Sequence, residues 1–116
     1  MQYLMLVYTD EKRWAEIPEP EKEQLWSDCH TYGQEIVKSG HLLAGAPLQP
    51  VATATTLRLH GGKLAITDGP FAETKEILAG YHLVECKDLD EALAIGSRFP
   101  GLRVGSALEV RPLLVR

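Results

Sequence analysis

The sequence predicts a single α+β domain over residues 1–116, and three observations lead to this prediction. Hydrophobic residues make up 45% of the 116 and charged residues 24%, which is ordinary usage for one globular domain. Strand-like and helix-like patterns follow one another as strand, helix, strand, and this order occurs twice. Between the two repeats, two short strand-like segments flank Gly61-Gly62, which predicts a β-hairpin.

The first strand, expected over Gln2 to Thr9, is apolar on both faces. One face carries Tyr3, Met5 and Val7, and the other carries Leu4, Leu6 and Tyr8. Strands of this kind are usually buried on both sides. A chain of this length supplies one layer of helices, so a second subunit is the simplest cover for the other face.

A helix is expected to begin at Pro18 and Pro20, since proline suits the first turn of a helix. It is expected to end before Gly40, which suits the position after a helix. Its apolar stripe is formed by Leu25, Cys29, Tyr32 and Ile36. A second strand is expected over residues 41–46.

The central hairpin is expected to pair residues 53–60 with residues 63–67. In that register one face carries four aliphatic side chains, those of Leu57, Leu59, Leu64 and Ile66. We expect this face to be buried and the other to be exposed. Residues 68–78 are expected to form a loop that can include a short helical turn near Glu73.

The second half repeats the pattern of the first. Strands are expected over residues 80–86 and 104–110, with a helix between them that begins at the capping pair Asp88 and Glu91 and ends at Pro100-Gly101. The complete order predicts a ferredoxin-like sandwich with an inserted β-hairpin. Because the first strand is apolar on both faces, we expect two such sheets to pack face to face in a homodimer.

Composition excludes several classes of partner. The net charge is −4 and no basic stripe occurs, which disfavours direct binding of nucleic acid. No apolar run approaches a membrane span, and the N-terminus lacks the features of a signal peptide, so we expect a cytoplasmic protein and no membrane contact. Cys29, Cys86 and the four scattered histidines have no metal-ligand spacing, and no phosphate-binding loop occurs, so we expect neither a metal nor a cofactor.

The segment Asp68-Gly69-Pro70-Phe71-Ala72-Glu73-Thr74-Lys75-Glu76 resembles the signature of the DGPF proteins, a branch of the YCII-related family. The resemblance covers the whole chain and includes residues 3–8, 45–49, 53–56 and 109–112. It implies a ferredoxin-like fold and dimers in which the sheets form an α+β barrel.

The resemblance also implies two classes of function. Related barrels enclose a cleft for small organic molecules, and a histidine with an aspartate has suggested enzymatic activity in the wider family. Other relatives occur with extracytoplasmic-function sigma factors. Counting back from Gly40, Cys29 rather than His30 matches the family's helix histidine, so we assign no His–Asp dyad to His30.

Asp68 and His82 form the one acid–base pair that the sequence suggests as catalytic. Asp68 comes where a strand ends, and a carboxylate there can act as a general base. The alternative is that it fixes the turn before Gly69-Pro70 through backbone hydrogen bonds. His82 is expected on an apolar strand face, where it either exchanges protons in a cleft or serves as a hydrogen-bonded core residue.

The rest of the motif loop is the candidate ligand-binding segment, comprising Gly69, Pro70, Phe71, Glu73 and Lys75. The alternatives are that Phe71 anchors the loop in the core or in a dimer interface, and that Glu73 and Lys75 are solvated or paired across the dimer.

Two hypotheses of function follow. The first is a dimeric small-molecule-binding domain, with cofactor-independent acid–base chemistry as an open question. The second is a regulatory protein-interaction module that works with a sigma factor. A ligand-sized pocket beside Asp68 would favour the first hypothesis, and a solid core would favour the second.

Overall fold

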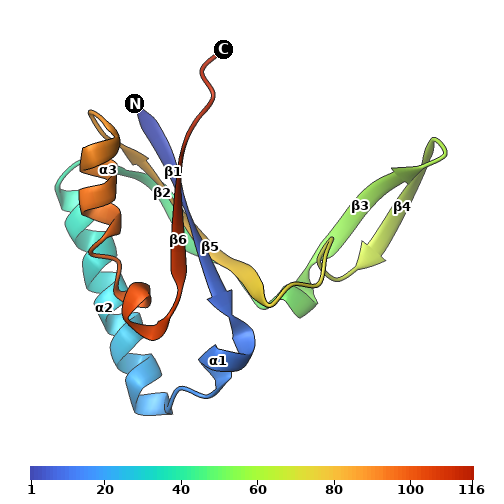
Figure 1. Cartoon of the computed structure of the whole chain (residues 1–116), viewed down its shortest axis with the longest axis horizontal. Coiled ribbons are helices and arrows are strands. Elements are labelled where there is room, and N and C mark those ends of the chain that lie inside the picture. Colours follow the sequence, from blue (N-terminus) through green and yellow to red (C-terminus); the bar gives the residue numbers. More distant parts are fainter.

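The computed structural model describes residues 1–116 and has an α+β architecture, as the sequence predicts (Figure 1). The elements in chain order are β1 (Gln2–Asp10), α1 (Glu11–Ala15), α2 (Glu19–Lys38), β2 (Leu42–Pro47), the 3-10 turn η1 (Val51–Thr53), β3 (Thr55–His60), β4 (Lys63–Asp68), β5 (Glu76–Glu85), α3 (Leu89–Gly96), the 3-10 turn η2 (Pro100–Val104) and β6 (Ala107–Pro112). None of the helices has the length and hydropathy that a membrane span requires.

Four strands form one antiparallel sheet in the order β2-β5-β1-β6, and β3 with β4 forms a separate two-stranded sheet. The central strand β1 pairs with β5 on one side and with β6 on the other. Met5 lies opposite His82 of β5 and opposite Val110 of β6. This register decides which side chains of the three strands share a face.

The core lies between one face of this sheet and the helices α2 and α3. Its buried members are Tyr3, Met5, Val7, Tyr32, Ile36, Val84, Cys86, Ala92, Ile95 and Phe99. The opposite face, called the open face below, carries Leu4, Leu6, Tyr8, Tyr81 and Leu83, all of which remain partly exposed. The two apolar faces of β1 are therefore confirmed, but one chain covers only one of them.

The helix boundaries follow from local chemistry. Pro18 precedes α2 and Pro20 lies in its first turn, as expected. The Asp88 side chain accepts a hydrogen bond from the backbone N–H of Glu91 at 2.9 Å, and the Glu91 carboxylate accepts one from the N–H of Lys87 at 3.1 Å. The capping pair of α3 is thus confirmed, with its reciprocal bond shifted by one residue from the ideal capping box.

Several boundaries differ from the expectation. The short helix α1 was not predicted, although Asp10 caps it by accepting hydrogen bonds from two backbone N–H groups. No helical turn forms near Glu73. Strand β5 begins at Glu76 because the strand pairs with the end of β1 as far as Asp10. Strand β6 begins only at Ala107, since η2 occupies the residues before it.

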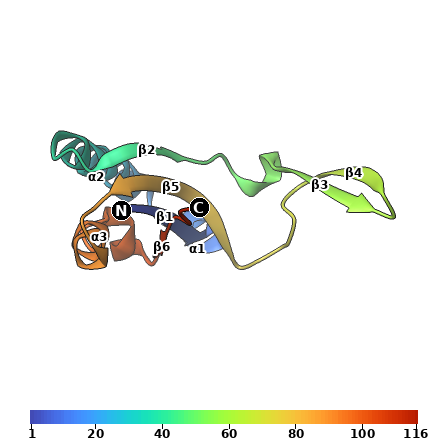
Figure 2. The ribbon, with the colours of Figure 1, turned by 90° about the horizontal axis from the view of Figure 1, so that it is seen from above.

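The hairpin β3–β4 forms an arm that projects away from the rest of the molecule (Figures 1 and 2). Its turn residues Gly61 and Gly62 have φ values of 55° and 80°, which suits glycine. The expected register is confirmed, with Leu57 opposite Ile66 and Leu59 opposite Leu64. The expected burial of this apolar face is wrong within one chain, because Leu59 is 71% exposed and its three companions are similar.

Candidate functional site

A cleft of about 930 Å³ lies between α2, α1 and the β2–β5 side of the sheet. Most of its wall is apolar. Its inner lining includes Val7, Leu25, Cys29, Gly45, His82 and Phe99. This volume is in the range of pockets that hold small organic molecules.

His82 lies in the wall of this cleft, on the side of β5 that faces the helices. Its ring packs edge-to-face on two aromatic rings, with centroids 5.8 Å from Tyr32 and 5.9 Å from Phe99. Those two rings are themselves 5.8 Å apart. The Tyr32 hydroxyl is held by a hydrogen bond that it donates to the Ile95 carbonyl at 2.9 Å. The imidazole is therefore one ring of a rigid aromatic cluster.

Strand β2 leaves room for this imidazole because a glycine stands opposite it. Gly45 pairs with His82 across the two strands. A Cβ atom at Gly45 would lie 2.9 Å from His82 Cδ2 and 2.9 Å from the carbonyl oxygen of Tyr81. Both distances are too short for a carbon atom that is not bonded to these atoms. Glycine, which has no Cβ atom, therefore allows β2 to approach β5 closely at this position.

The two ring nitrogens of His82 differ in their surroundings. Nδ1 is enclosed and has no hydrogen-bond partner, the only buried side-chain nitrogen or oxygen in the chain of which this is true. Nε2 has no partner either but is not enclosed, so it is the nitrogen that a molecule in the cleft can reach. Burial lowers the pKa of His82 below its usual value, and the imidazole is therefore neutral at pH 7.

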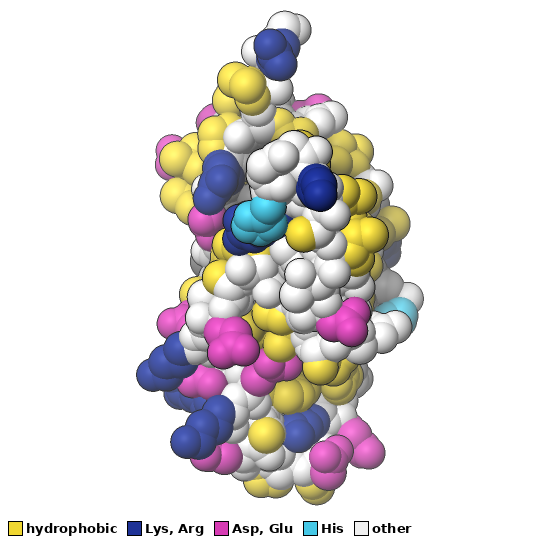
Figure 3. All heavy atoms as spheres, turned by 90° about the vertical axis from the view of Figure 1, so that its right-hand side faces the viewer, with side chains coloured by type: hydrophobic (Ala, Val, Ile, Leu, Met, Phe, Trp, Pro, Cys, Tyr) yellow, Lys and Arg dark blue, Asp and Glu magenta, His cyan; other side chains and the backbone are white.

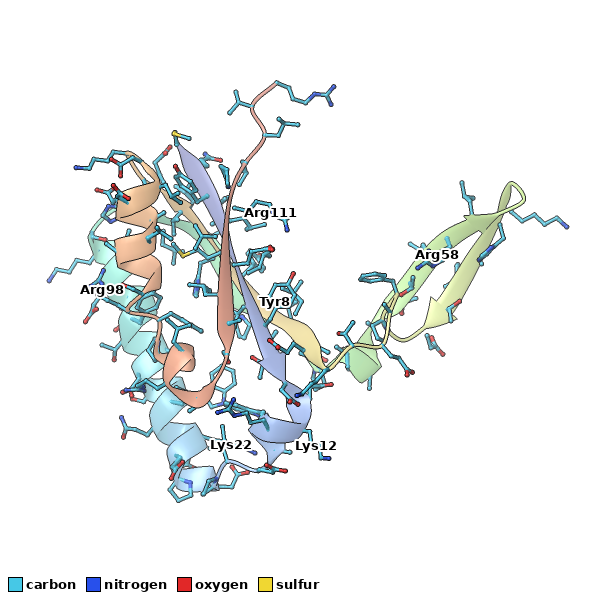
Figure 4. The ribbon with its side chains drawn as sticks, viewed as in Figure 1. Tyr8, Lys12, Lys22, Arg58, Arg98 and Arg111 are labelled. Carbon is cyan, nitrogen blue, oxygen red and sulfur yellow. The ribbon has the colours of Figure 1, made fainter.

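Two tryptophans also line the cleft. The rings of Trp14 in α1 and Trp26 in α2 meet edge-to-face with centroids 6.0 Å apart. The ammonium group of Lys22 lies 5.5 Å from the centre of the Trp14 ring. Figure 4 shows Lys22 at this lower end of the molecule, between α2 and α1. These aromatic and cation–π contacts join α1 to α2 beside the cleft.

Cys29 is the other chemically reactive side chain in the lining. Burial raises the pKa of its thiol above the usual value, and the positive charge of Arg103 opposes this shift only in part. The thiol is therefore protonated at neutral pH and is a poor nucleophile. No group of three His, Cys, Asp or Glu side chains lies close enough together to hold a metal ion.

The structure places Asp68 away from this cleft. Asp68 is the last residue of β4, opposite Thr55 at the base of the arm, and it is exposed. The turn that follows is held by backbone contacts, since the Gly69 N–H donates to the Ala54 carbonyl at 2.7 Å and Thr56 Oγ1 donates to the Gly69 carbonyl at 2.7 Å. Asp68 and His82 thus do not line a common cavity.

The remaining motif-loop residues also lie outside the cleft. Phe71 is 75% exposed, so it does not pack into the core of the single chain, and its packing in a dimer interface stays a prediction. Arg58 of β3 donates a hydrogen bond to the Phe71 carbonyl at 3.4 Å. Glu73 and Lys75 are exposed, and no ion pair joins either of them to another side chain of the chain.

Sequence reasoning missed three contributors to the cleft, namely Trp14, Trp26 and Gly45. The first tryptophan comes from a helix that the sequence did not predict, and the second lies outside the predicted apolar stripe of its helix. Gly45 carried a usable signal, because an isolated glycine inside a strand often marks a close approach of another backbone.

Comparison with known proteins agrees with the resemblance noted in the motif loop. A family model described as the YCII-related domain matches residues 1–114. The chain belongs to the YCII-related family. It is 38% identical over 114 residues to an uncharacterized protein of Rhizobium meliloti (strain 1021), and the match covers 97% of this chain and 92% of that relative.

The lowered pKa of His82 predicts that this YCII-related protein loses stability as the pH falls. The unfolded chain binds a proton at this side chain near pH 6.5, whereas the folded chain resists it. The contribution of neutral His82 is therefore complete above about pH 6.5 and declines below it. Melting temperatures from pH 8 to pH 5 should fall more steeply for the wild type than for His82→Phe. Equal slopes would contradict this prediction.

Proposed function

We propose that this protein binds a small, largely apolar organic molecule in the cleft beside His82, and that His82 Nε2 forms the polar contact. The observation that supports this most directly is a neutral, unpartnered imidazole in the wall of an apolar cleft of about 930 Å³. Nε2 makes no hydrogen bond within the chain, so a ligand with one polar group can bond to it. The enclosed Nδ1 stays without a partner in this arrangement.

The chemistry available there is proton exchange without a cofactor. A neutral imidazole can accept a proton from a ligand and return it, and its lowered pKa keeps it in the accepting form at pH 7. The aromatic contacts with Tyr32 and Phe99 hold the ring in one orientation. In this proposal Asp68 does not act on the same molecule, since it lies at the base of the arm.

The alternative function is a regulatory module that binds a sigma factor. That hypothesis predicts a filled core, whereas a ligand-sized cleft lies under α2. The cleft therefore favours small-molecule binding, although it lies beside His82 and not beside Asp68. Both cysteines are free thiols, in keeping with the cytoplasmic location that we propose.

We also propose that the protein works as a homodimer whose sheets pack through their open faces in an α+β barrel. The strand order β2-β5-β1-β6, with helices between β1 and β2 and between β5 and β6, supports a ferredoxin-like arrangement of the body. Leu4, Leu6 and Tyr81 of the open face are only partly covered within one chain. A second sheet would remove these side chains from water.

Binding is tested by titrating the protein with lactones, aromatic acids and dicarboxylates while recording tryptophan fluorescence. Because Trp14 and Trp26 line the cleft and are the only tryptophans, a ligand there should change the emission. The same compounds should raise the melting temperature, since a ligand at 100 times its Kd adds about 2.7 kcal/mol of stability.

The decisive variant is His82→Phe, which keeps an aromatic ring in the cluster but removes both nitrogens. We expect it to remain folded, because removal of an unpartnered buried nitrogen costs little, and to bind any ligand about tenfold more weakly. His60→Phe is the matched control, since His60 is exposed on the arm. Unchanged affinity in His82→Phe, or no ligand in a broad screen, would overturn the proposal.

A further inference from the structure

The arm formed by β3 and β4 is apolar on one face and has no partner within the chain. Leu57, Leu59, Leu64 and Ile66 on that face are each 60% or more exposed. β3 packs substantially only against β4, and no helix covers either strand. Four adjacent exposed aliphatic side chains on one face form the kind of patch that marks an interaction surface.

The whole molecule exposes more surface than a compact chain of its mass. Its accessible surface is 8193 Å², roughly 1,900 Å² more than the approximately 6,300 Å² expected for a folded monomer of 12.8 kDa. Its radius of gyration is 16.1 Å, against about 13 Å for a compact domain of this length. A standard interface buries about 800 Å² per partner, so the excess is large enough for an extensive one.

A second copy of this chain fits the shape that the arm creates. The arm leaves the body near the lower ends of β1 and β5 and rises on the side opposite α2 and α3, at an angle to the open face of the sheet (Figure 1). On that side, hydrophobic side chains are spread between the charged groups (Figure 3). Tyr8 and Arg111 of the body project toward the same side (Figure 4).

Two-fold symmetry makes the same surfaces available twice. Each copy has one uncovered apolar arm and one partly covered apolar sheet face. A closed dimer can cover all four surfaces, because in a two-fold interface every contact occurs twice. A different protein would have to supply both complementary surfaces itself.

We infer that the arms are exchanged in the dimer: each β3–β4 arm reaches across and lays its apolar face on the body of the other copy. The inference rests on the homodimer proposed above. To the packing of the two open faces it adds a contact between the apolar face of each arm and the body of the other copy. It also explains why Leu57, Leu59, Leu64 and Ile66 are aliphatic although one chain leaves them in water.

The test compares neighbouring substitutions on opposite faces of the arm. Leu59→Asp places a charge on the apolar face, and His60→Asp places the same charge on the polar face, opposite Lys63. Both positions are exposed in the single chain, so neither substitution changes its buried core. Sedimentation equilibrium should show a dimer for the wild type and for His60→Asp. For Leu59→Asp we expect a Kd raised about 100-fold or more.

Cross-linking separates exchanged arms from a dimer held by the sheets alone. A photoreactive side chain at position 59 of an untagged copy should cross-link to peptides of β1, β5 or β6 from a co-expressed tagged copy. Cross-links only within one chain, equal dimerisation in the variants of the two faces, or a monomeric wild type at all concentrations would overturn the inference. Because His82 faces the helices, ligand titrations of the arm variants test the cleft independently.

Discussion

Replacing Ile36 with alanine is expected to lower the free energy of unfolding by about 3–4 kcal/mol. Ile36 lies on the inner face of α2 and is completely buried among the core residues, with Met5 and Val84 equally buried on the sheet. Alanine would remove three carbons and leave a cavity where the main helix packs on the sheet. For a chain of this length the melting temperature should fall by roughly 12 °C or more.

Val37→Ala is the matched control for this substitution. Val37 is the next residue of the same helix and is 59% exposed, so its truncation should cost less than about 1 kcal/mol. Chemical denaturation of both variants, analysed with a common m-value, gives the comparison. Similar losses in the two variants would mean that α2 does not pack on the sheet through Ile36.

A substitution at Gly45 should be the most damaging change within the cleft. In Gly45→Ala the new Cβ atom would lie 2.9 Å from the Tyr81 carbonyl oxygen, which is backbone and cannot turn aside, and equally close to the ring of His82. Relief requires β2 to separate from β5 or the imidazole to leave its place. We expect a loss of about 2–3 kcal/mol together with weaker ligand binding.

Gly33→Ala provides a control for this substitution, because Gly33 also lines the cleft but a Cβ atom added there would meet nothing within 4 Å. Gly33 lies inside α2, where alanine is favoured over glycine by about 1 kcal/mol, so this variant should be more stable than the wild type. Thermal melting and ligand titration of both variants test the argument. Equal stability of the two alanine variants would show that β2 does not approach His82 as closely as described.

Local chemistry determined much of this fold. The alternation of side chains along β1 predicted its two apolar faces. The Gly61-Gly62 turn determined the register of the arm. The Asp88–Glu91 pair marked the start of α3. These features depend on residues that are close together in the chain. The same holds for the family resemblance, which rests on short contiguous segments and above all on the one from Asp68 to Glu76.

Only the tertiary structure decided which residues share a site. Asp68 and His82 are only 14 positions apart in the sequence. In the structure, however, Asp68 lies at the base of the arm, whereas His82 lies in the main sheet, opposite Gly45 and in the cleft beneath α2. Sequence periodicity gives the face of each strand but not the order of the strands, and this order depends on pairings between distant segments. The same distinction applies to the arm. The sequence pattern predicts its apolar face, but only the folded chain shows that this face lies away from the core.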